Sequence, residues 1–261
     1  MTDRDTRRLS FGTVAADYDR YRPPPPSQAL DWLIPPGATA VLDLAAGTGA
    51  VTRLLIGRAE RVFAVEPDDR MRAVLAARSP GVRAVAGRGE AIGVPDASTD
   101  GVFVSSAWHW LDPGRAVPEI ARVLRDGGRL GVIWTSRDRE VDWVAELDTL
   151  RRPHAVRSAG DARSQLRRRH EVTLPGGAQF ENIASASFAF VRTMTVDDAV
   201  DWLATYSGLI TAPAEERAAG LARAREALLR RANEDGVIEI PIRSACWRAD
   251  RVPRPASGRP L

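Results

Sequence analysis

Residues 41–55 read VLDLAAGTGAVTRLL: a short apolar run reaches one aspartate, a loop of small residues follows, and apolar residues return at helical spacing. This change of pattern predicts a buried strand, a tight loop and a helix. In an open parallel sheet, ligands bind outside the carboxyl ends of the strands, and small side chains let a ligand approach the backbone closely. The segment therefore predicts a ligand site at the loop between the strand and the helix.

Strand and helix patterns alternate through the first half of the chain, which predicts β–α–β units in a parallel sheet. The expected strands there are residues 40–44, 61–65, 82–86, 101–105 and 130–134, and the expected helices are 50–56, 68–78 and one that begins near Pro118. Beyond residue 150, the polar segment 151–170 precedes strand patterns at 180–191 and 237–252, the latter as one long strand or a strand pair, with helices at 196–205 and 215–232 between them. The chain is thus expected to adopt an α/β fold.

Length and composition narrow the class of protein. A chain of 261 residues with 44% hydrophobic content can bury a full-sized core. Cys246 is the one cysteine, so no intramolecular disulfide forms and no cysteine pair can bind zinc. The start has no signal-peptide pattern, and no stretch approaches the ~18 apolar residues of a membrane span. We therefore expect a cytoplasmic protein without a metal site or a membrane anchor.

All 37 basic side chains are arginine, and the 34 acidic residues leave a formal net charge of +3. The arginine clusters at residues 151–152 and 167–169 could contact phosphates. Acidic residues are nearly as numerous, however, and no aromatic residues alternate with the arginines as stacking on nucleic-acid bases would require. The composition therefore predicts no nucleic-acid partner.

The loop matches neither of two phosphate-binding patterns. A Rossmann dinucleotide site has G-x-G-x-x-G, but Gly47 and Gly49 are followed by Thr52. A Walker loop requires a lysine, and the sequence contains none. Both comparisons disfavour a phosphate as the group that this loop holds.

Two acidic residues indicate a different ligand. Asp43 begins the loop, and Glu66 follows the second strand 23 residues later, near the spacing at which a carboxylate binds two ribose hydroxyls. Asp43 suits a ligand with an ammonium group, because a cation near a helix N-terminus needs a compensating negative charge. A nucleoside joined to an amino acid would satisfy both residues. The alternative is that Asp43 caps the following turn and Glu66 caps a helix.

Longer motifs carry a resemblance to a known family. DLAAGTG at 43–49, VEPDDRM at 65–71, GRGEAIGVPDASTDGVFVSSAWHWLDP at 87–113 and EIARVLRDGGRLGVIW at 119–134 together resemble class I S-adenosylmethionine-dependent methyltransferases of the methyltransferase type 11 family. The ends of the chain are similar, more loosely, to a trans-aconitate-methyltransferase-like subgroup. The resemblance implies a Rossmann-like fold with a mostly parallel seven-stranded sheet, helices on both faces and a helical cap.

The resemblance also implies S-adenosylmethionine as the cofactor and S-adenosylhomocysteine as its product. Residues at matching positions would contact the methionine end, the ribose or the adenine. They are Asp43, Ala45, Gly47, Thr48, Gly49, Glu66, Pro67, Met71, Gly89, Glu90 and Ser105. Ala45 stands where the family usually has glycine, which is tolerated if its φ is negative. Met71 is equally compatible with a place in the core.

His109 lies near the carboxyl end of the fourth expected strand, where acceptors approach in this fold, and is the candidate catalytic base. A base helps a phenol, an amine or a carbon acid, whereas a carboxylate needs none. The alternative for His109 is a structural hydrogen bond. His154 and His170 lie in arginine-rich segments and are expected in solvent. The candidate acceptor-binding residues are Tyr18, Tyr21, Arg22, Trp108, Trp134, Arg137, Trp202 and Tyr206.

The sequence therefore predicts methyl transfer from S-adenosylmethionine to an oxygen, nitrogen or carbon atom of a small molecule, with a carboxylate among the options, in an enclosed pocket. A nicotinamide-dependent oxidoreductase and a non-catalytic S-adenosylmethionine-binding protein are the alternatives, and a monomer or homodimer is expected. The expected segments are an N-terminal cap at 1–35, the S-adenosylmethionine-binding core at 36–150, late strands with inserted cap helices at 151–252 and a disordered tail at 253–261.

Overall fold

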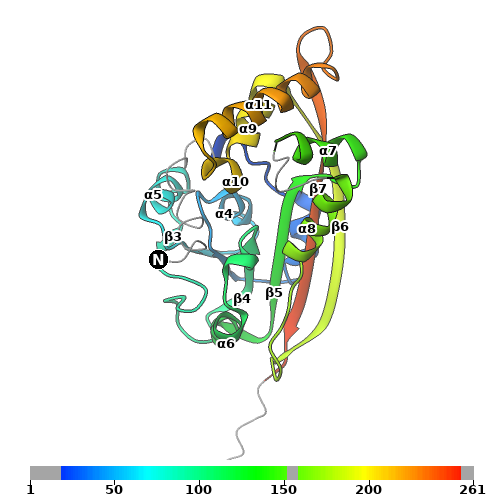
Figure 1. Cartoon of the computed structure of the whole chain (residues 1–261). Coiled ribbons are helices and arrows are strands. Elements are labelled where there is room, and N and C mark those ends of the chain that lie inside the picture. The colour runs from blue at the N-terminus through cyan, green and yellow to red at the C-terminus, as the bar shows by residue number, and fades with distance from the viewer. Residues whose placement is uncertain (1–18, 152–157, 254–261) are drawn as a thin grey trace, which may run out of the picture. The chain divides into compact units, whose positions relative to one another are not determined.

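Seven strands form one sheet in the computed structural model, which describes residues 19–151 and 158–253. The strand order is β3-β2-β1-β4-β5-β7-β6 (Figure 1). The strands are β1 (Ala40–Leu44), β2 (Arg61–Val65), β3 (Arg83–Val85), β4 (Thr99–Ser105), β5 (Leu124–Arg137), β6 (Phe180–Thr195) and β7 (Val237–Arg251). The expected strands are confirmed, and the limits of β1 and β2 coincide with those predicted.

Strands β1 to β5 pair in parallel, with β1 between β2 and β4. Asp43 on β1 is the Cα partner of Ala64 on β2 and of Phe103 on β4. All five residues of β1 are buried, which is typical of a parallel strand covered on both faces. The carboxyl ends of β1, β2 and β4 therefore lie at one edge of the sheet, where Asp43, Glu66 and Ser105 are found.

Strands β6 and β7 run antiparallel, so the sheet is mixed. The Val252 amide donates to the Gln179 carbonyl at one end of the pair, and the Val196 amide donates to the Gly236 carbonyl at the other, both at 3.0 Å. The segment expected as a strand pair or one long strand is one long strand, and both partners are visible as long ribbons in Figure 1.

The helices are α3 (Ser27–Leu33), α4 (Ala50–Leu55), α5 (Asp69–Arg78), η2 (Trp108–Trp110), α6 (Pro113–Val123), α7 (Asp142–Arg151), α8 (Ala159–Arg169), α9 (Val196–Ala204), α10 (Ser207–Ile210) and α11 (Ala214–Leu229). Of these, α3, η2, α7, α8 and α10 were not among the expected helices, and α6 begins earlier than expected. The start predicted near Pro118 is wrong, because Asp112 caps α6 by accepting from the Gly114 amide at 3.0 Å. The polar segment contains α8, where Ala162 is the one residue recorded as buried, so no apolar periodicity marks this helix.

The described residues belong to two compact units. One draws on Met1–Pro26, Trp134–Glu171 and Ser187–Ser244, and the other on Ser27–Ile133, Val172–Ala186 and Ala245–Leu261. We call them the first and the second unit. The expected cap and segment limits remain predictions.

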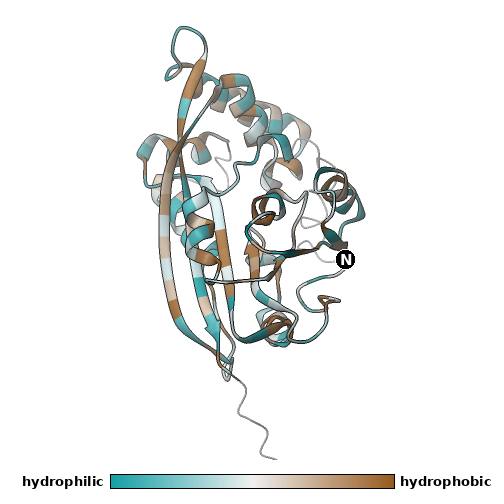
Figure 2. Ribbon diagram, turned by 180° about the vertical axis from the view of Figure 1, so that it is seen from behind, coloured by the Kyte–Doolittle hydropathy of each residue, from teal (hydrophilic) through white to brown (hydrophobic). Residues whose placement is uncertain are grey.

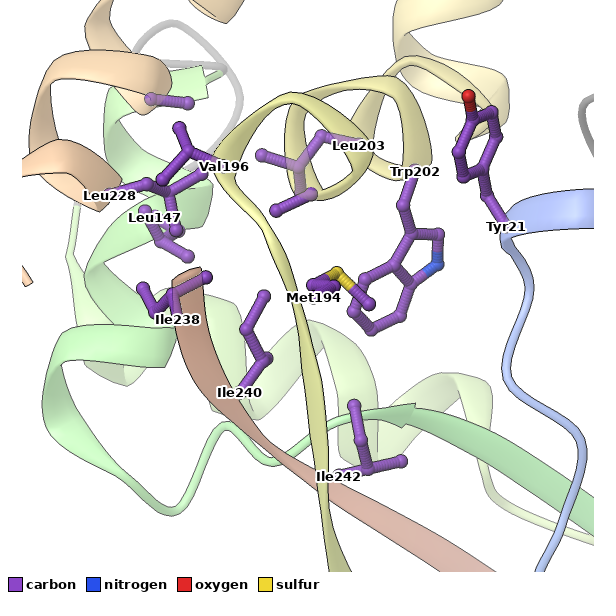
Figure 3. Packing of buried hydrophobic residues seen from close by; sticks show 12 residues of the cluster. Tyr21, Leu147, Met194, Val196, Trp202, Leu203, Leu228, Ile238, Ile240 and Ile242 are labelled. Atoms are coloured by element: carbon purple, nitrogen blue, oxygen red, sulfur yellow. The ribbon is translucent and has the colours of Figure 1, made fainter. Parts of the chain in front are cut away.

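The first unit has a hydrophobic core of its own. Its helices α7, α9 and α11 pack together, and Trp202 and Leu203 on α9 lie near Ile240 and Ile242 on β7 (Figure 3). The buried residues of α11 are Gly220, Ala224 and Leu228, which are four apart and share one face of the helix. Figure 2 shows both hydrophilic and hydrophobic residues on the helices of this unit. No helix in the described part of the chain is long and apolar enough to cross a membrane.

Candidate active site

The loop after β1 requires glycine at two positions. Gly47 and Gly49 have φ of +58° and +84°, a region that residues with a side chain rarely adopt. Gly49 also lies tightly against α5, because a Cβ there would be 3.0 Å from Cγ of Leu75. A Cβ on Gly47 would meet nothing within 4 Å. The small residues of the opening segment thus allow a sharp turn, and the backbone at Gly47 borders open space.

Ala45 does not meet the condition under which alanine is tolerated at this position. Its φ is +56° and not negative. A left-handed backbone costs a residue with a Cβ roughly 1–2 kcal/mol, because the Cβ approaches the following carbonyl oxygen. The neighbouring Ala46 amide donates to the Val65 carbonyl at 3.0 Å, which holds this part of the loop against β2. Ala45 is therefore strained, whereas the other two residues of this turn with a positive φ, Gly47 and Gly49, are glycines.

Asp43 is a buried carboxylate with one oxygen unused. Its Oδ2 accepts from Oγ1 of Thr52 at 2.6 Å, whereas no described group donates to Oδ1. Burial raises the pKa of Asp43 from 3.8 to about 7, although hydrogen bonds from Thr52 oppose the rise. Asp43 therefore ties the loop to α4 through one oxygen only, and the other is available to a ligand that carries a donor.

Glu66 joins the end of β2 to the loop after β1. Its Oε2 accepts from the Gly47 amide and its Oε1 from the Asp68 amide, both at 2.9 Å. Each carboxylate oxygen keeps a further lone pair, so two hydroxyl groups can still bind. Burial raises the pKa of Glu66, and the two backbone donors oppose this rise. The alternative role of Glu66 as a helix cap is wrong, because Asp68 caps α5 by accepting from the amides of Arg70 and Met71.

Three further residues of the second unit are candidates for contact with the cofactor: Thr48, Pro67 and Met71. Pro67 is half-buried directly after it, and Met71 is buried on α5 with 4% exposure. The buried Thr48 hydroxyl has no hydrogen bond within the described residues. Met71 is thus compatible with both of its expected roles, in the core and beside a ligand.

The remaining cofactor candidates follow β3 and β4. A Cβ on Gly89 would be 2.7 Å from Cδ2 of Leu111, so only glycine fits there without a shift of the leucine. Glu90 Oε1 accepts from the Asp112 amide at 3.0 Å, which links the loop after β3 to the start of α6. Ser105 is half-buried at the end of β4. The fold thus brings the candidates from three strands to the same edge of the sheet.

His109 lies in the short turn η2 just after β4, near the strand end where it was expected. Its ring centroid is 4.6 Å from that of Trp110, and both residues are half-buried. Trp108 is 3% exposed and packs in the interior. His109 is therefore partly accessible, whereas Trp108 is a buried residue of the second unit.

The acceptor candidates of the first unit form a cluster with arginines. The Tyr21 hydroxyl donates to Oδ2 of Asp201 at 2.9 Å, and the Arg22 guanidinium lies 3.9 Å from the ring centroid of Tyr206. Tyr18 lies outside the described residues. Tyr21 and Arg22 are thus held in place by residues about 180 positions later in the chain.

Arg137 is fully buried beside the same aromatic residues. Its guanidinium carbon is 5.8 Å from the Trp202 ring centroid and 5.1 Å from that of Tyr206. Its Nη2 donates to Oδ1 of Asp148 at 2.9 Å, and Arg139 Nε donates to Oδ2 at 2.5 Å. Burial disfavours the charged guanidinium, but Asp148 and Tyr206 outweigh it and raise the pKa of Arg137.

His170 is not in solvent as expected. Its ring stacks on that of buried Trp134, with centroids 4.7 Å apart and planes 18° apart. Burial, with the charges of Arg139 and Arg169, lowers the pKa of His170 to about 3. Trp134 therefore contacts His170 directly. The position of His154 lies outside the described residues.

Four residues of this cluster were absent from the sequence-based candidates: Arg139, Asp148, Arg192 and Asp201. Arg192 lies 6.0 Å from the Trp202 ring centroid, and its Nη1 donates to the Tyr21 carbonyl. Its place on β6, two residues before buried Met194, was a usable signal because side chains two apart on a strand share a face. Asp148 carries no such signal, since its partners lie at the end of β5 (Arg137) and in the turn that follows (Arg139).

Comparisons with known proteins agree with this geometry. The family described as "Methyltransferase domain" matches residues 42–132. An uncharacterized methyltransferase of Mycobacterium tuberculosis is 41% identical over 244 residues, which cover 92% of this chain and 95% of that protein. The chain belongs to the class I S-adenosylmethionine-dependent methyltransferases.

Two further matches concern the fold and the core of this methyltransferase. The structure of a type II methyltransferase candidate from Anaeromyxobacter dehalogenans has a TM-score of 0.70 and 24% identity, and the alignment covers 90% of this chain and 100% of that one. A malonyl-[acyl-carrier protein] O-methyltransferase of Methylococcus capsulatus is 31% identical over 145 residues, 47% of this chain and 48% of that protein. The expected Rossmann-like fold is thereby confirmed, and the family match and the Mycobacterium relative confirm the expected enzyme class.

The residues at the sheet edge fit the cofactor of this family. S-Adenosylmethionine carries an ammonium group, which suits the unused Oδ1 of Asp43. Its ribose has two neighbouring hydroxyls, which suit the remaining lone pairs of Glu66. The open space beside Gly47 allows close approach to the backbone.

Proposed function

We propose that this methyltransferase binds S-adenosylmethionine at the carboxyl ends of β1 and β2 and methylates a small-molecule acceptor. The observation that carries this proposal is the buried Asp43, whose Oδ1 receives no donor from the described residues. A buried carboxylate oxygen is costly without a partner, so the site is prepared for a ligand with a positive donor.

The bound cofactor supplies a methyl group that is already activated by positive sulfur. The chain therefore has to align a nucleophile with that methyl group and exclude water. Asp43 balances the ammonium charge, Glu66 binds the ribose hydroxyls, and Gly47 admits the ligand to the backbone. His109 accepts a proton where the acceptor loses one. The other proposed cofactor contacts are Ala45, Thr48, Gly49, Pro67, Met71, Gly89, Glu90 and Ser105.

A carboxylate-bearing acceptor is the class that we favour. The Methylococcus relative is named as an O-methyltransferase of malonyl-[acyl-carrier protein], and a malonyl group ends in a carboxylate. A trans-aconitate-like specificity would agree with the same chemistry. The proposed acceptor contacts are Tyr18, Tyr21, Arg22, Trp108, Trp134, Arg137, Trp202 and Tyr206.

Calorimetry tests the cofactor assignment. Wild-type protein should bind S-adenosylmethionine and S-adenosylhomocysteine but not NAD. Glu66→Gln keeps the size of the side chain and removes its charge, and should weaken binding about tenfold, or 1.4 kcal/mol. The exposed Glu60→Gln, near the start of β2, is the matched control and should bind like wild type. Preferential binding of NAD, or unchanged affinity in Glu66→Gln, would contradict the assignment.

Turnover separates an enzyme from a non-catalytic binding protein. Release of S-adenosylhomocysteine should depend on an added small acceptor, whereas a binding protein would release none with any acceptor. If His109 acts as a base, His109→Gln should lower turnover at least tenfold and leave the affinity for S-adenosylmethionine unchanged. Equal losses of stability and cofactor affinity would instead assign His109 a structural role.

A further inference from the structure

We propose that the first unit contains a buried binding site for one carboxylate group, centred on Arg137 and Trp202. The inference rests on the proposed function, because it assigns this site to the anionic group of the methyl acceptor. It also names Arg192 as a further member of the site.

The first step is the charge balance around Asp148. Arg137 and Arg139 are 1% and 7% exposed, and both donate to the same carboxylate. Asp138, the other buried acid on this segment, pairs with Arg243 through Nη2 at 2.7 Å. Two buried guanidinium groups thus share one carboxylate, which leaves one positive charge unbalanced among the described residues. Asp148 favours the charged form of Arg137, but it is the counterion of two guanidinium groups, so a second negative charge would stabilise the pair further.

The second step is the unused donors. Nε and Nη1 of Arg137 are buried and make no hydrogen bond within the described residues. The indole Nε1 of Trp202, which is 0% exposed, has none either. Buried donors normally have partners, and each missing bond costs roughly 1–3 kcal/mol. Buried donors without a partner among the described residues therefore lie on two elements, β5 and α9.

The third step is the surroundings of these donors. The rings of Trp202 and Tyr206 have centroids 6.4 Å apart, and Arg137 faces both. Arg192 lies near the Trp202 ring from the side of β6. Burial lowers the pKa of its guanidinium, and the charge of Asp198 opposes this shift. Trp202 projects from α9 beside Met194 (Figure 3). Aromatic walls with a few convergent donors are typical of sites for small organic molecules.

The fourth step is the choice of ligand. One unbalanced positive charge matches a carboxylate, which carries a single negative charge, better than a doubly charged phosphate. The indole N–H and a guanidinium both donate to oxygen. The aromatic neighbours suit an apolar remainder. These observations favour a small organic acid with an apolar chain as the acceptor.

Binding of simple acids tests the site without any methyl transfer. Acetate, butyrate and hexanoate are titrated into the full chain by calorimetry, with the corresponding primary amides as uncharged probes. The acids should bind at least tenfold more tightly than the amides, and affinity should increase from acetate to hexanoate. Equal binding of acids and amides, or no binding of hexanoate up to 20-fold above the concentration at which the chain is half-saturated with S-adenosylmethionine, would overturn the proposal.

Conservative variants test the named donors. Trp202→Phe removes the indole N–H and keeps an aromatic ring, and should weaken hexanoate binding about tenfold, or 1.4 kcal/mol. Arg192→Gln should weaken it by a smaller factor. Leu221→Phe, a ring added elsewhere in the same core, is the control and should leave hexanoate affinity unchanged. Wild-type affinity for hexanoate in Trp202→Phe would overturn the proposal.

The same samples distinguish two kinds of failure. Affinity for S-adenosylmethionine is measured on each, and should be unchanged in Trp202→Phe and Arg192→Gln because neither belongs to the second unit. Intact cofactor binding without acid binding would refute the carboxylate site alone. Loss of cofactor binding in wild type would refute the proposed function instead.

Discussion

The left-handed backbone of Ala45 lowers the stability of the folded protein, and a single substitution can test this. Because its φ is +56°, Ala45→Gly should raise the free energy of unfolding by about 0.5–1 kcal/mol, measured by urea titration. The neighbouring Ala46→Gly is the control, since its φ is not positive. That change should lower stability, because glycine loses more conformational freedom on folding. Equal effects of the two substitutions would contradict the assigned strain.

Asp43 should couple cofactor binding to a proton. Its pKa of about 7 means that much of the side chain is neutral just below pH 7, whereas an ammonium group attracts the ionised form. Affinity for S-adenosylmethionine should therefore rise from pH 6 to pH 8, by up to tenfold per unit below the pKa. Binding should also release a proton, which calorimetry in buffers of different ionisation enthalpy detects. Asp43→Asn should remove both effects, and a pH-dependent affinity in this variant would refute the role of Asp43.

Among the helices, α6 contains a proline in its interior, and the sequence pattern predicted that the helix begins near this proline. Pro118 has no N–H to donate to the Gly114 carbonyl, four residues earlier, yet the helix runs from Pro113 to Val123. The residue is exposed, so Pro118→Ala should restore the bond without loss of packing and stabilise the protein by about 1–2 kcal/mol. Arg115→Ala, also exposed on α6, should change stability by less than about 0.5 kcal/mol. A destabilised Pro118→Ala would show that the proline ring contributes packing.

For the molecule as a whole, the free energy of unfolding should depend on pH through His170 and Asp43, which act in opposite directions. His170 has a pKa of about 3 when folded and 6.5 when unfolded, so the unfolded chain binds more protons between these values. Its contribution is complete above pH 6.5 and is lost as the pH falls toward 3. The raised pKa of Asp43 gives the reverse: its contribution is complete below pH 3.8 and is lost as the pH rises through 7.

Unfolding measured by urea at several pH values separates the two groups. His170→Phe keeps a ring against Trp134 and should flatten the loss of stability between pH 6.5 and 3. Asp43→Asn should flatten the loss between about pH 4 and 7 and leave the histidine contribution in place. An unchanged pH profile in His170→Phe would show that His170 titrates normally in the folded protein.

Features that depend on neighbours along the chain could be predicted before the structure was known. The limits of β1 and β2, the small-residue loop with Gly47 and Gly49, and the order of Asp43 and Glu66 follow from local patterns of apolar, small and acidic residues. These patterns predicted an α/β fold and a ligand site, because a parallel sheet places successive strand ends at one edge. The enzyme class followed from the family resemblance of the longer motifs.

Contacts between separate segments could not be predicted, because they depend on how the elements pack. Tyr21 meets Asp201, 180 residues away, and Arg137 shares Asp148 with Arg139 between a strand and a helix. His170 likewise stacks on Trp134, although its polar, arginine-rich segment had predicted a side chain in solvent. The local sequence indicates whether a residue can be buried or can donate a hydrogen bond, but the packing of the elements determines which partner it meets. The helix α8 could not be predicted for a related reason: with Ala162 as its buried residue, it has almost no apolar periodicity.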